Sequence, residues 1–212
     1  MIVEIVTIGD ELLLGETIDV NAVWLARELG AIGISVARRT TVGDGAAAIT
    51  EAVREAVHRT GAVITTGGLG PTSDDRTRPA IAALFGRELK FDDDIWEGLR
   101  SLWRERGRPG EPPDANRQQA LVPEGATVLT NRHGTAPGLF LQDELGRWVA
   151  LLPGVPREMR GLMADELMPL LRARTTDDRR VVRSLTLRTT GIAESQLPEL
   201  LGEYADGLGA TS

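Results

Sequence analysis

The sequence predicts an α/β protein, a three-layer α/β/α architecture with a mostly parallel central sheet and a short C-terminal β-α segment. One observation is that apolar, β-branched runs typical of strands alternate three times with helical patterns before residue 86. Strands that alternate with helices form parallel sheets with right-handed crossovers. The other is that each run ends in a polar turn containing glycine and aspartate. Parallel sheets bind ligands beyond the carboxyl ends of their strands, so these turns are candidate site segments.

The first half of the chain contains three strand-helix units. Each strand is predicted from β-branched apolar residues and each helix from apolar residues at a spacing of three or four. Asp19 or Asn21 begins the first helix, and Asp44 or a neighbour begins the second. We expect strands at 2–8, 34–41 and 62–64, and helices at 19–30, 44–61 and 79–85.

The second half continues with shorter elements and two loops. We expect helices at 92–106, 116–121 and 156–171, and strands at 127–129, 139–141 and 147–152. The last two strands form a hairpin across residues 143–146. Residues 107–113 are dense in Pro and Gly, and the excursion over 107–120 is predicted to be a lid or a subunit contact.

The C-terminal tail cannot form a core of its own. A polar linking segment is expected at 172–180, a strand at 183–190 and a helix at 194–204. Because one strand and one helix are too few for an independent core, the tail is either the start of a second small domain or an arm that packs elsewhere.

Composition restricts the possible functions. The 212 residues carry a net charge of −7, which gives no general attraction to nucleic acid. The chain has no cysteine, which excludes disulfides, thiolate zinc sites and cysteine nucleophiles. No apolar segment approaches the ~20 residues of a membrane span, and no leader precedes the first strand, so we expect a cytoplasmic protein.

The glycine-rich turn over 65–77 is the main candidate site. Gly67, Gly68 and Gly70 are predicted to present N–H groups to a phosphate at the start of the next helix. Thr72 and Ser73 add hydroxyl groups. The turn matches neither the dinucleotide fingerprint nor the P-loop. Asp74 and Asp75 either cap the helix or bind a metal ion and orient a water molecule.

Further candidates lie in the other turns. Gly9, Asp10 and Glu11 follow the first strand and Asp44 follows the second, so five carboxylates are expected along one sheet edge. Asp10 and Glu11 are either site residues or solvated turn residues, and Asn21 either caps its helix or contacts a ligand. The later candidates, which either shape a pocket or serve only as turn, dipole or surface residues, are His133, Thr135, Pro137, Gly138, Pro153, Gly154 and Glu158.

Four separated motifs carry a resemblance to a known family. They occupy residues 9–15 with 19–21, 67–77, 134–138 and 153–158. The chain resembles the CinA family (competence/damage-inducible protein), whose N-terminal domain has the molybdopterin-binding-domain fold of MoaB, MogA and the gephyrin E-domain. The resemblance implies such a domain at 1–172. It also implies, at 173–212, a linker and the truncated start of a small KH-like α+β domain. The nicotinamide-mononucleotide deamidase domain that often ends family members has no counterpart here.

The resemblance implies a metal-dependent hydrolase of a nucleotide pyrophosphate bond, converting ADP-ribose to AMP and ribose 5-phosphate. The implied cofactor is a divalent metal, Mg²⁺ or Co²⁺, because such an ion neutralises phosphate charge and activates water. We expect Asp75, Asp74 and Asp44 to be catalytic, with Asp74, Asp75 and Asp10 binding metal. The expected substrate-binding residues are Gly9, Asp10, Glu11, Asn21, Gly67, Gly68, Gly70, Thr72, Ser73, Thr135, Pro137, Gly138, Pro153, Gly154 and Glu158.

Two other functions stay open at the level of the sequence. One is a molybdopterin-binding or adenylyl-transfer module of molybdenum cofactor metabolism. The other is a non-catalytic assembly domain for a separately encoded nicotinamide-nucleotide deamidase. In all cases the expected partner is a small-molecule nucleotide or pterin phosphate rather than nucleic acid or membrane, and the expected assembly is a homo-oligomer, a dimer or trimer.

Overall fold

The computed structural model describes residues 1–174 and 188–202. The chain divides into two compact units, Met1–Val182 and Arg183–Ser212. In the second unit, η3 (Glu194–Gln196) and α8 (Leu197–Leu201) lie within the helix predicted over 194–204. Residues 183–187 of the predicted strand lie outside the described residues. The KH-like interpretation of this tail stays a prediction.

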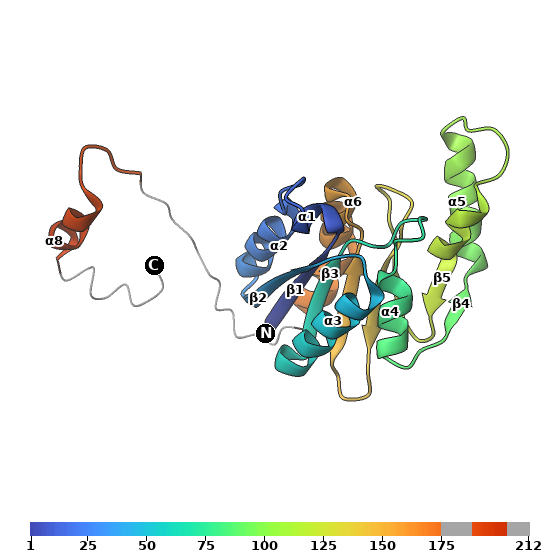
Figure 1. The fold of residues 1–212 in the computed structure, drawn as a ribbon, viewed down its shortest axis with the longest axis horizontal. Helices are drawn as coiled ribbons and strands as arrows, with labels where there is room; N and C mark the ends of the chain where they lie inside the picture. Colours follow the sequence, from blue (N-terminus) through green and yellow to red (C-terminus); the bar gives the residue numbers. More distant parts are fainter. Residues whose placement is uncertain (175–187, 203–212) are drawn as a thin grey trace. The chain divides into compact units, whose positions relative to one another are not determined.

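A six-stranded sheet forms the centre of the first unit (Figure 1), with the order β2-β1-β3-β8-β7-β6. Its strands are β1 (Ile2–Ile8), β2 (Ser35–Val42), β3 (Ala62–Thr66), β6 (Thr127–Leu129), β7 (Gly138–Gln142) and β8 (Trp148–Leu152). β2, β1, β3 and β8 run parallel, whereas β7 and β6 pair antiparallel. The predicted mostly parallel sheet and the hairpin from β7 to β8 are confirmed.

Helices cover both faces of this sheet, which confirms the three layers. One apolar cluster packs α2 (Val20–Ala31) and α6 (Pro156–Leu162) against one face. The other packs α3 (Ala46–Thr60) and α4 (Thr77–Leu84) against the opposite face, which is in front in Figure 1. The predicted helix at 156–171 is a continuous run of α6, a π-helical turn η2 (Met163–Leu167) and α7 (Met168–Arg174). Among the described residues, no helix is long and apolar enough to cross a membrane.

An arm over residues 89–123 projects beside β6 and β7 (Figure 1). It contains β4 (Leu89–Phe91), α5 (Asp93–Glu105), the 3₁₀ helix η1 (Asp114–Ala120) and β5 (Leu121–Pro123). β4 and β5 form a separate antiparallel pair that the sequence did not predict. These two strands form by pairing with one another across a long stretch of intervening chain, which a local pattern does not reveal. Asp92 caps α5 by accepting from Ile95 N.

The starts of three helices test the sequence-based expectations. α2 is capped by Asp19, which accepts from Ala22 N at 2.9 Å, so Asn21 is not the cap. α3 begins after Gly45, the neighbour of Asp44, in agreement with the predicted start at Asp44 or a neighbour. α4 begins after Arg76, and no side chain caps it. The helix-cap interpretation of Asp74 and Asp75 is therefore wrong.

Candidate functional site

The turns after β1 and β2 are joined by two aspartates. Asp10, the first residue of α1 (Asp10–Leu13), donates its N–H to Asp44 Oδ2 at 3.0 Å. Asp44 donates its N–H to Asp10 Oδ1 at 3.2 Å. A Cβ atom at Gly43 would collide with Asp10 Oδ1, so the glycine admits this close approach. Gly9 N donates to Val42 O at 3.0 Å and adds a backbone link between the same turns.

Carboxylates gather around this pair. Burial raises the pKa of Asp44, the hydrogen bond from Asp10 N opposes the rise, and the nearby charges of Asp10, Glu11 and Asp74 add to it. Four of the five predicted carboxylates therefore interact at the carboxyl edge of the sheet. A concentration of like charge at a strand end is a place where a cation would relieve repulsion.

The fifth carboxylate, Asp75, is used by the glycine-rich turn itself. It accepts from Gly70 N and Thr72 N, each at 2.8 Å, and from Thr72 Oγ1 at 2.5 Å. The Thr72 hydroxyl also lowers the pKa of the exposed Asp74. The Thr72 hydroxyl has a single proton, which it can donate to only one carboxylate at a time. The short contact with Thr72 Oγ1 favours Asp75 as the acceptor. Ser73 is exposed, and its carbonyl accepts from Arg76 Nε at 3.2 Å.

The glycines of the turn serve close packing, and two of the three N–H groups predicted to bind phosphate are paired within the protein. Gly67 N donates to Leu152 O at 3.0 Å and Gly70 N donates to Asp75, so both N–H groups are used within the protein. Gly67 (φ 111°) and Gly68 (φ 66°) have left-handed backbones. A Cβ at Gly67 would collide with Ile8 O, and one at Gly68 with Thr77 Oγ1. These glycines press the turn against β1 and α4.

Two residues that the sequence did not single out hold this turn, Gln118 from the arm and Arg78 from α4. Gln118 Nε2 donates to Gly70 O at 3.1 Å and to Thr72 O at 2.8 Å. Arg78, only 2% exposed, donates from Nη1 to Gln118 O, and burial lowers its pKa to about 10. An arginine in the first turn of an apolar helix was a usable signal for Arg78. The position of Gln118 depends on tertiary packing and gave no local signal.

The turn after β8 is fixed by an asparagine from α2. Asn21 Nδ2 donates to Gly154 O at 2.7 Å and to Thr66 Oγ1 at 3.1 Å. Thr66 Oγ1 donates in turn to Pro153 O at 2.9 Å. The structure thus brings three predicted site residues, Asn21, Pro153 and Gly154, together at the end of β3.

The loop before β7 is organised by Glu158, which accepts from Asn131 Nδ2 at 2.7 Å. Asn131 also donates to Ala136 O and accepts from His133 N. His133 Nε2 lies 2.9 Å from Asp165 Oδ2. Asp165 belongs to the π-helical turn η2, and turns of this kind are frequent at functional sites. Asn131 and Asp165 were not predicted, although Asn131 lies three residues before the predicted motif at 134–138.

The remaining candidates of this loop divide between cavity and core. Thr135 Oγ1 accepts from Gln119 Nε2 at 3.3 Å, and Pro137 lines a cavity. Gly138 is buried in β7, where a Cβ would lie 3.1 Å from Leu151 O. Its absent side chain therefore serves packing of the sheet.

A cavity of about 620 Å³ lies between α5 and this loop. His133, Thr135 and three arginines, Arg106, Arg132 and Arg157, are among its lining residues. A second cavity of about 360 Å³ shares Thr135 and Arg106 and reaches Pro71 of the glycine-rich turn. This cleft has the size of sites that hold small organic ligands.

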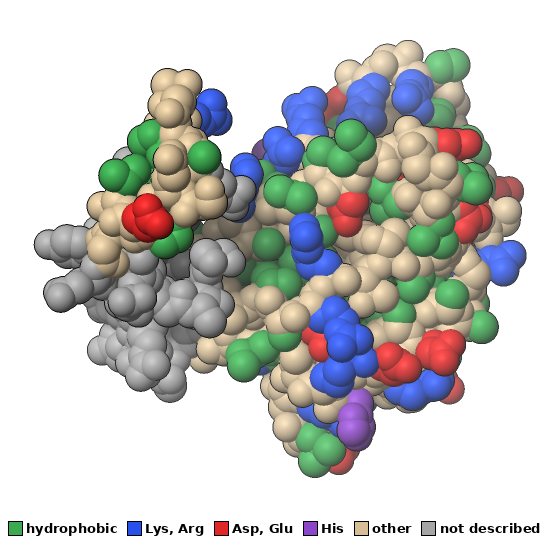
Figure 2. Space-filling view, turned by 60° about the vertical axis from the view of Figure 1, so that its left-hand side comes forward, with side chains coloured by type: hydrophobic (Ala, Val, Ile, Leu, Met, Phe, Trp, Pro, Cys, Tyr) green, Lys and Arg blue, Asp and Glu red, His purple; other side chains and the backbone are tan. Residues whose placement is uncertain are grey.

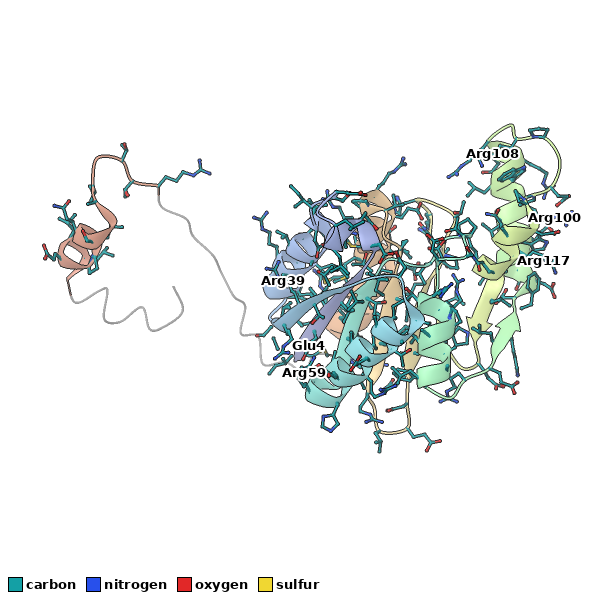
Figure 3. All side chains as sticks on the ribbon, viewed as in Figure 1. Glu4, Arg39, Arg59, Arg100, Arg108 and Arg117 are labelled. Atoms are coloured by element: carbon teal, nitrogen blue, oxygen red, sulfur yellow. The ribbon has the colours of Figure 1, made fainter. Side chains whose placement is uncertain are left out.

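The face shown in Figure 2 carries charged side chains of both signs. On the face in Figure 2, Lys and Arg side chains are interspersed with acidic and apolar ones and form no continuous basic surface. On the arm, Arg100 is paired with Glu97 and Glu111, and Arg117 stacks over Phe91 (Figure 3).

Comparisons with known proteins give a consistent result. The family model described as a probable molybdopterin binding domain matches residues 4–173. A CinA-like protein of Gemmatimonas aurantiaca is 60% identical over 208 residues, which are 98% of this chain and 48% of that protein. A CinA-like protein of Deinococcus deserti is 43% identical over 96% of this chain and 49% of its own length. The chain thus spans about half the length of these relatives.

Solved structures agree with the fold. The crystal structure of CinA from Thermoplasma acidophilum, described as of unknown function, is similar with a TM-score of 0.71 and 32% identity, over 80% of this chain and 97% of that one. The molybdopterin biosynthesis enzyme MoaB of Thermus thermophilus is similar with a TM-score of 0.53 and 24% identity, over 80% and 91% of the two chains. The second likeness concerns the fold alone.

Proposed function

The chain belongs to the CinA family through a domain of the molybdopterin-binding type, and from this premise we propose that it is a metal-dependent hydrolase of a nucleotide pyrophosphate bond. The proposed reaction converts ADP-ribose and water to AMP and ribose 5-phosphate. The observation that carries the proposal is the reciprocal pair of Asp10 and Asp44 beside Glu11 and Asp74.

The carboxylates fit a divalent metal ion that needs only one or two protein ligands. Among residues 1–174 and 188–202, no group of three or more His, Asp or Glu side chains is arranged to hold a metal ion. Mg²⁺ needs fewer protein ligands, since it is commonly bound by one or two carboxylates, water and substrate phosphates. Asp10 and Asp44 fit that role. Asp75, whose carboxylate accepts three hydrogen bonds from the turn, does not.

A bound divalent ion would neutralise phosphate charge and lower the pKa of a water molecule. The protein's own residues orient the substrate. Arg106, Arg132 and Arg157 line the larger cavity together with Asp92, Asp94 and Glu105, and the arginines would contact the phosphate groups of a ligand. Asp75 and Gln118 keep the glycine-rich turn in one conformation between this cavity and the carboxylates. Glu158 and Asn131 hold the loop that carries Thr135.

Incubation with ADP-ribose and Mg²⁺ or Co²⁺, followed by measurement of AMP, tests the proposal. We expect Asp44→Asn to lower turnover by roughly 100-fold or more, because metal-dependent activation of water contributes several kcal/mol. Asp93→Asn, a change at an exposed residue in the first turn of α5, is the matched control and should keep full turnover. Undiminished turnover in Asp44→Asn, or no AMP at any metal concentration, would overturn the proposal.

A second candidate is the binding of molybdopterin or its adenylylated form. The description of the matching family model favours it, as does the cleft that can admit a pterin. Binding of molybdopterin without production of AMP from ADP-ribose would select this function. The assembly role for a deamidase, the homo-oligomer and the cytoplasmic location stay predictions.

A further inference from the structure

Helix α5 presents an apolar face to the cavity of about 620 Å³. Ile95, Leu99 and Leu102 line this cavity, and their spacing of four and three residues places them on one face of the helix. Gly98 lies on the same face, and a Cβ atom built there would have no heavy atom within 4 Å. Glycine inside a helix is destabilising relative to alanine. Since no packing contact requires this glycine, its effect is to widen the cavity along α5.

The loop before β7 and the start of α6 form a basic wall of the same cavity. This wall consists of Arg132, His133 and Arg157. Both arginines are exposed, and neither forms an ion pair or a hydrogen bond with a described residue. Guanidinium groups bind phosphate oxygens through short, charge-assisted hydrogen bonds. The basic wall is therefore available to an anionic group of a ligand.

His133 is held so that one nitrogen of its ring remains free. Nε2 lies 2.9 Å from Asp165 Oδ2, and because an ionised carboxylate only accepts, Nε2 carries a proton. A Cβ atom at Gly161 would collide with Cδ2 of the ring, so this edge packs against α6. Nδ1, on the other edge, makes no hydrogen bond to the described residues and is not among their buried unpaired atoms, so a ligand can reach it. In the charged ring, Nδ1 donates to a phosphate oxygen.

The wall formed by α5 has the opposite charge at its start. Asp92 and Asp94 line the cavity there. At the other end of the helix, Arg106 adjoins Glu105 and offsets its charge. Carboxylates repel a phosphate group and accept hydrogen bonds from amino and hydroxyl groups. The cavity thus favours an anion at the basic wall, N–H or O–H donors near the start of α5, and an apolar ring on the face around Gly98.

A nucleoside monophosphate carries groups of these three kinds. Its phosphate is anionic, its base and sugar carry N–H and O–H donors, and its purine ring is flat with apolar faces. Ribose 5-phosphate, the other half of the proposed substrate, has a phosphate and hydroxyl groups but no ring of this kind. The apolar face of α5 therefore distinguishes the two halves of ADP-ribose, because only the adenosine half buries a ring against it.

We infer that this cavity is the subsite for the adenosine 5′-phosphate half of the substrate, with the phosphate on the basic wall and the purine ring on the Gly98 face of α5. The phosphate accepts from Arg132, His133 and Arg157. The inference rests on the proposed function, because it assigns one half of ADP-ribose to this cavity. The ribose 5-phosphate half is then left to the carboxylates of the proposed metal site.

Calorimetry on the full chain in EDTA tests the subsite without requiring turnover or metal. Because arginines rather than a metal ion hold the phosphate, AMP should bind, and roughly 10-fold or more tightly than ribose 5-phosphate, which buries no ring. Arg157→Ala should weaken AMP binding by roughly 10-fold or more, the usual effect of losing a hydrogen bond to a charged group. Arg38→Ala is the matched control, since Arg38 is an exposed residue of β2 that does not line the cavity. It should keep AMP affinity within about twofold.

Gly98→Leu tests the apolar face by filling the space beside it. The Cβ atom meets no neighbour, and leucine favours a helix over glycine, so the variant should fold. AMP binding should weaken by roughly 10-fold or more, because the leucine side chain takes the place of the ring. Gly30→Leu in α2 is the matched control, since a Cβ atom there also has no heavy atom within 4 Å and Gly30 does not line the cavity. It should bind AMP as the wild type does.

Each outcome of these measurements supports or overturns the inference. AMP binding that is no tighter than that of ribose 5-phosphate, or that is unchanged in Arg157→Ala and Gly98→Leu, would overturn it, as would an absence of AMP binding. Arg157 is exposed, so its variant remains informative if Gly98→Leu fails to fold. AMP binding with the expected losses but no hydrolysis of ADP-ribose would exclude the hydrolase and leave the subsite standing. Hydrolysis of ADP-ribose that Gly98→Leu does not slow would leave the hydrolase standing and exclude the subsite.

Discussion

Strand β1 carries carboxylates at both of its ends, and the protein treats them in opposite ways. Glu4, near the start of the strand, is 2% exposed and accepts from Arg59 Nε and Nη2, each at 2.8 Å (Figure 3). Asp10, just past the other end, faces Asp44 with Glu11 and Asp74 close by. One end is neutralised by a matched cation, and the other concentrates like charge.

The difference separates stability from function along a single strand. A carboxylate buried with a bidentate arginine needs nothing from outside the protein. Where neighbouring carboxylates raise the pKa of one another, the folded protein is less stable than it would be with a cation bound beside them. Groups with pKa values shifted in this way are common at functional sites. The two ends should therefore respond in opposite directions when a charge is removed.

The largest effect on stability is expected from Arg59→Ala. This change leaves the carboxylate of Glu4 buried without its cation, and breaking such a pair is strongly destabilising. We expect the free energy of unfolding to fall by about 3–5 kcal/mol, which corresponds to a fall in Tm of roughly 6–20 °C for a domain of this size. Calorimetry measures the shift, and ADP-ribose turnover per folded molecule should be unchanged.

Arg39→Ala provides the control for this prediction. Arg39 is an exposed residue of the edge strand β2 (Figure 3), so its removal should change Tm by little. An equal fall in both variants would show that general loss of positive charge, rather than the pairing of Glu4, is responsible. The conclusion that the Glu4 end of β1 serves stability through its ion pair would then be wrong.

The next effect concerns Asp75, which resembles Glu4 in being satisfied by the protein. In Asp75→Asn, the new amide NH₂ group would replace one of the two carboxylate oxygens and would face the N–H group of either Gly70 or Thr72. We expect a loss of about 2 kcal/mol in the free energy of unfolding, the usual worth of hydrogen bonds to a charged group. Urea denaturation measures it, and Asp74→Asn at the exposed neighbour should leave stability nearly unchanged. A larger loss in Asp74→Asn would contradict the assignment.

The sequence was sufficient for the elements that depend on local pattern. Ile2–Ile8 shows β-branched periodicity, and Ala46–Thr60 shows apolar residues at helical spacing, so both were found. β4 and β5 depend on pairing with one another, which no local pattern reveals. The 3₁₀ character of η1 likewise depends on its packing against α5.

For the site, the sequence identified the turns but not the partners within them. It placed Asp10, Asp44 and Asp74 at one sheet edge, as the structure does. It assigned Asp75 to metal and Gly70 N to phosphate, whereas these two groups bond to each other. Which acceptor a loop N–H finds depends on the backbone dihedral angles of the turn, and a sequence motif does not specify these.

The smallest effect, and the most informative one, is expected from Asp44→Asn without metal. The raised pKa of Asp44 means that the native state holds this proton to higher pH than the unfolded chain does. The contribution of Asp44 to stability is therefore complete below its ordinary pKa of 3.8 and is lost as pH rises through the raised value. Asn retains the acceptor for Asp10 N but carries no charge. The variant should match the wild type near pH 3.5 and be slightly more stable at pH 7, as urea denaturation can show.

Saturating Mg²⁺ should reverse this order at pH 7. A ligand that binds only the folded state stabilises it by mass action, about 2.7 kcal/mol at 100 times its Kd. The wild type gains this stabilisation, whereas Asp44→Asn, with one carboxylate fewer, gains little. Stability changes at Asp75 and Arg59 should be independent of metal, because their partners lie within the protein. If Mg²⁺ raised the Tm of wild type and Asp44→Asn equally, the carboxylate of Asp44 would have no role in binding metal. The repulsion among the carboxylates at this end of β1 would then have to be relieved by something other than Mg²⁺.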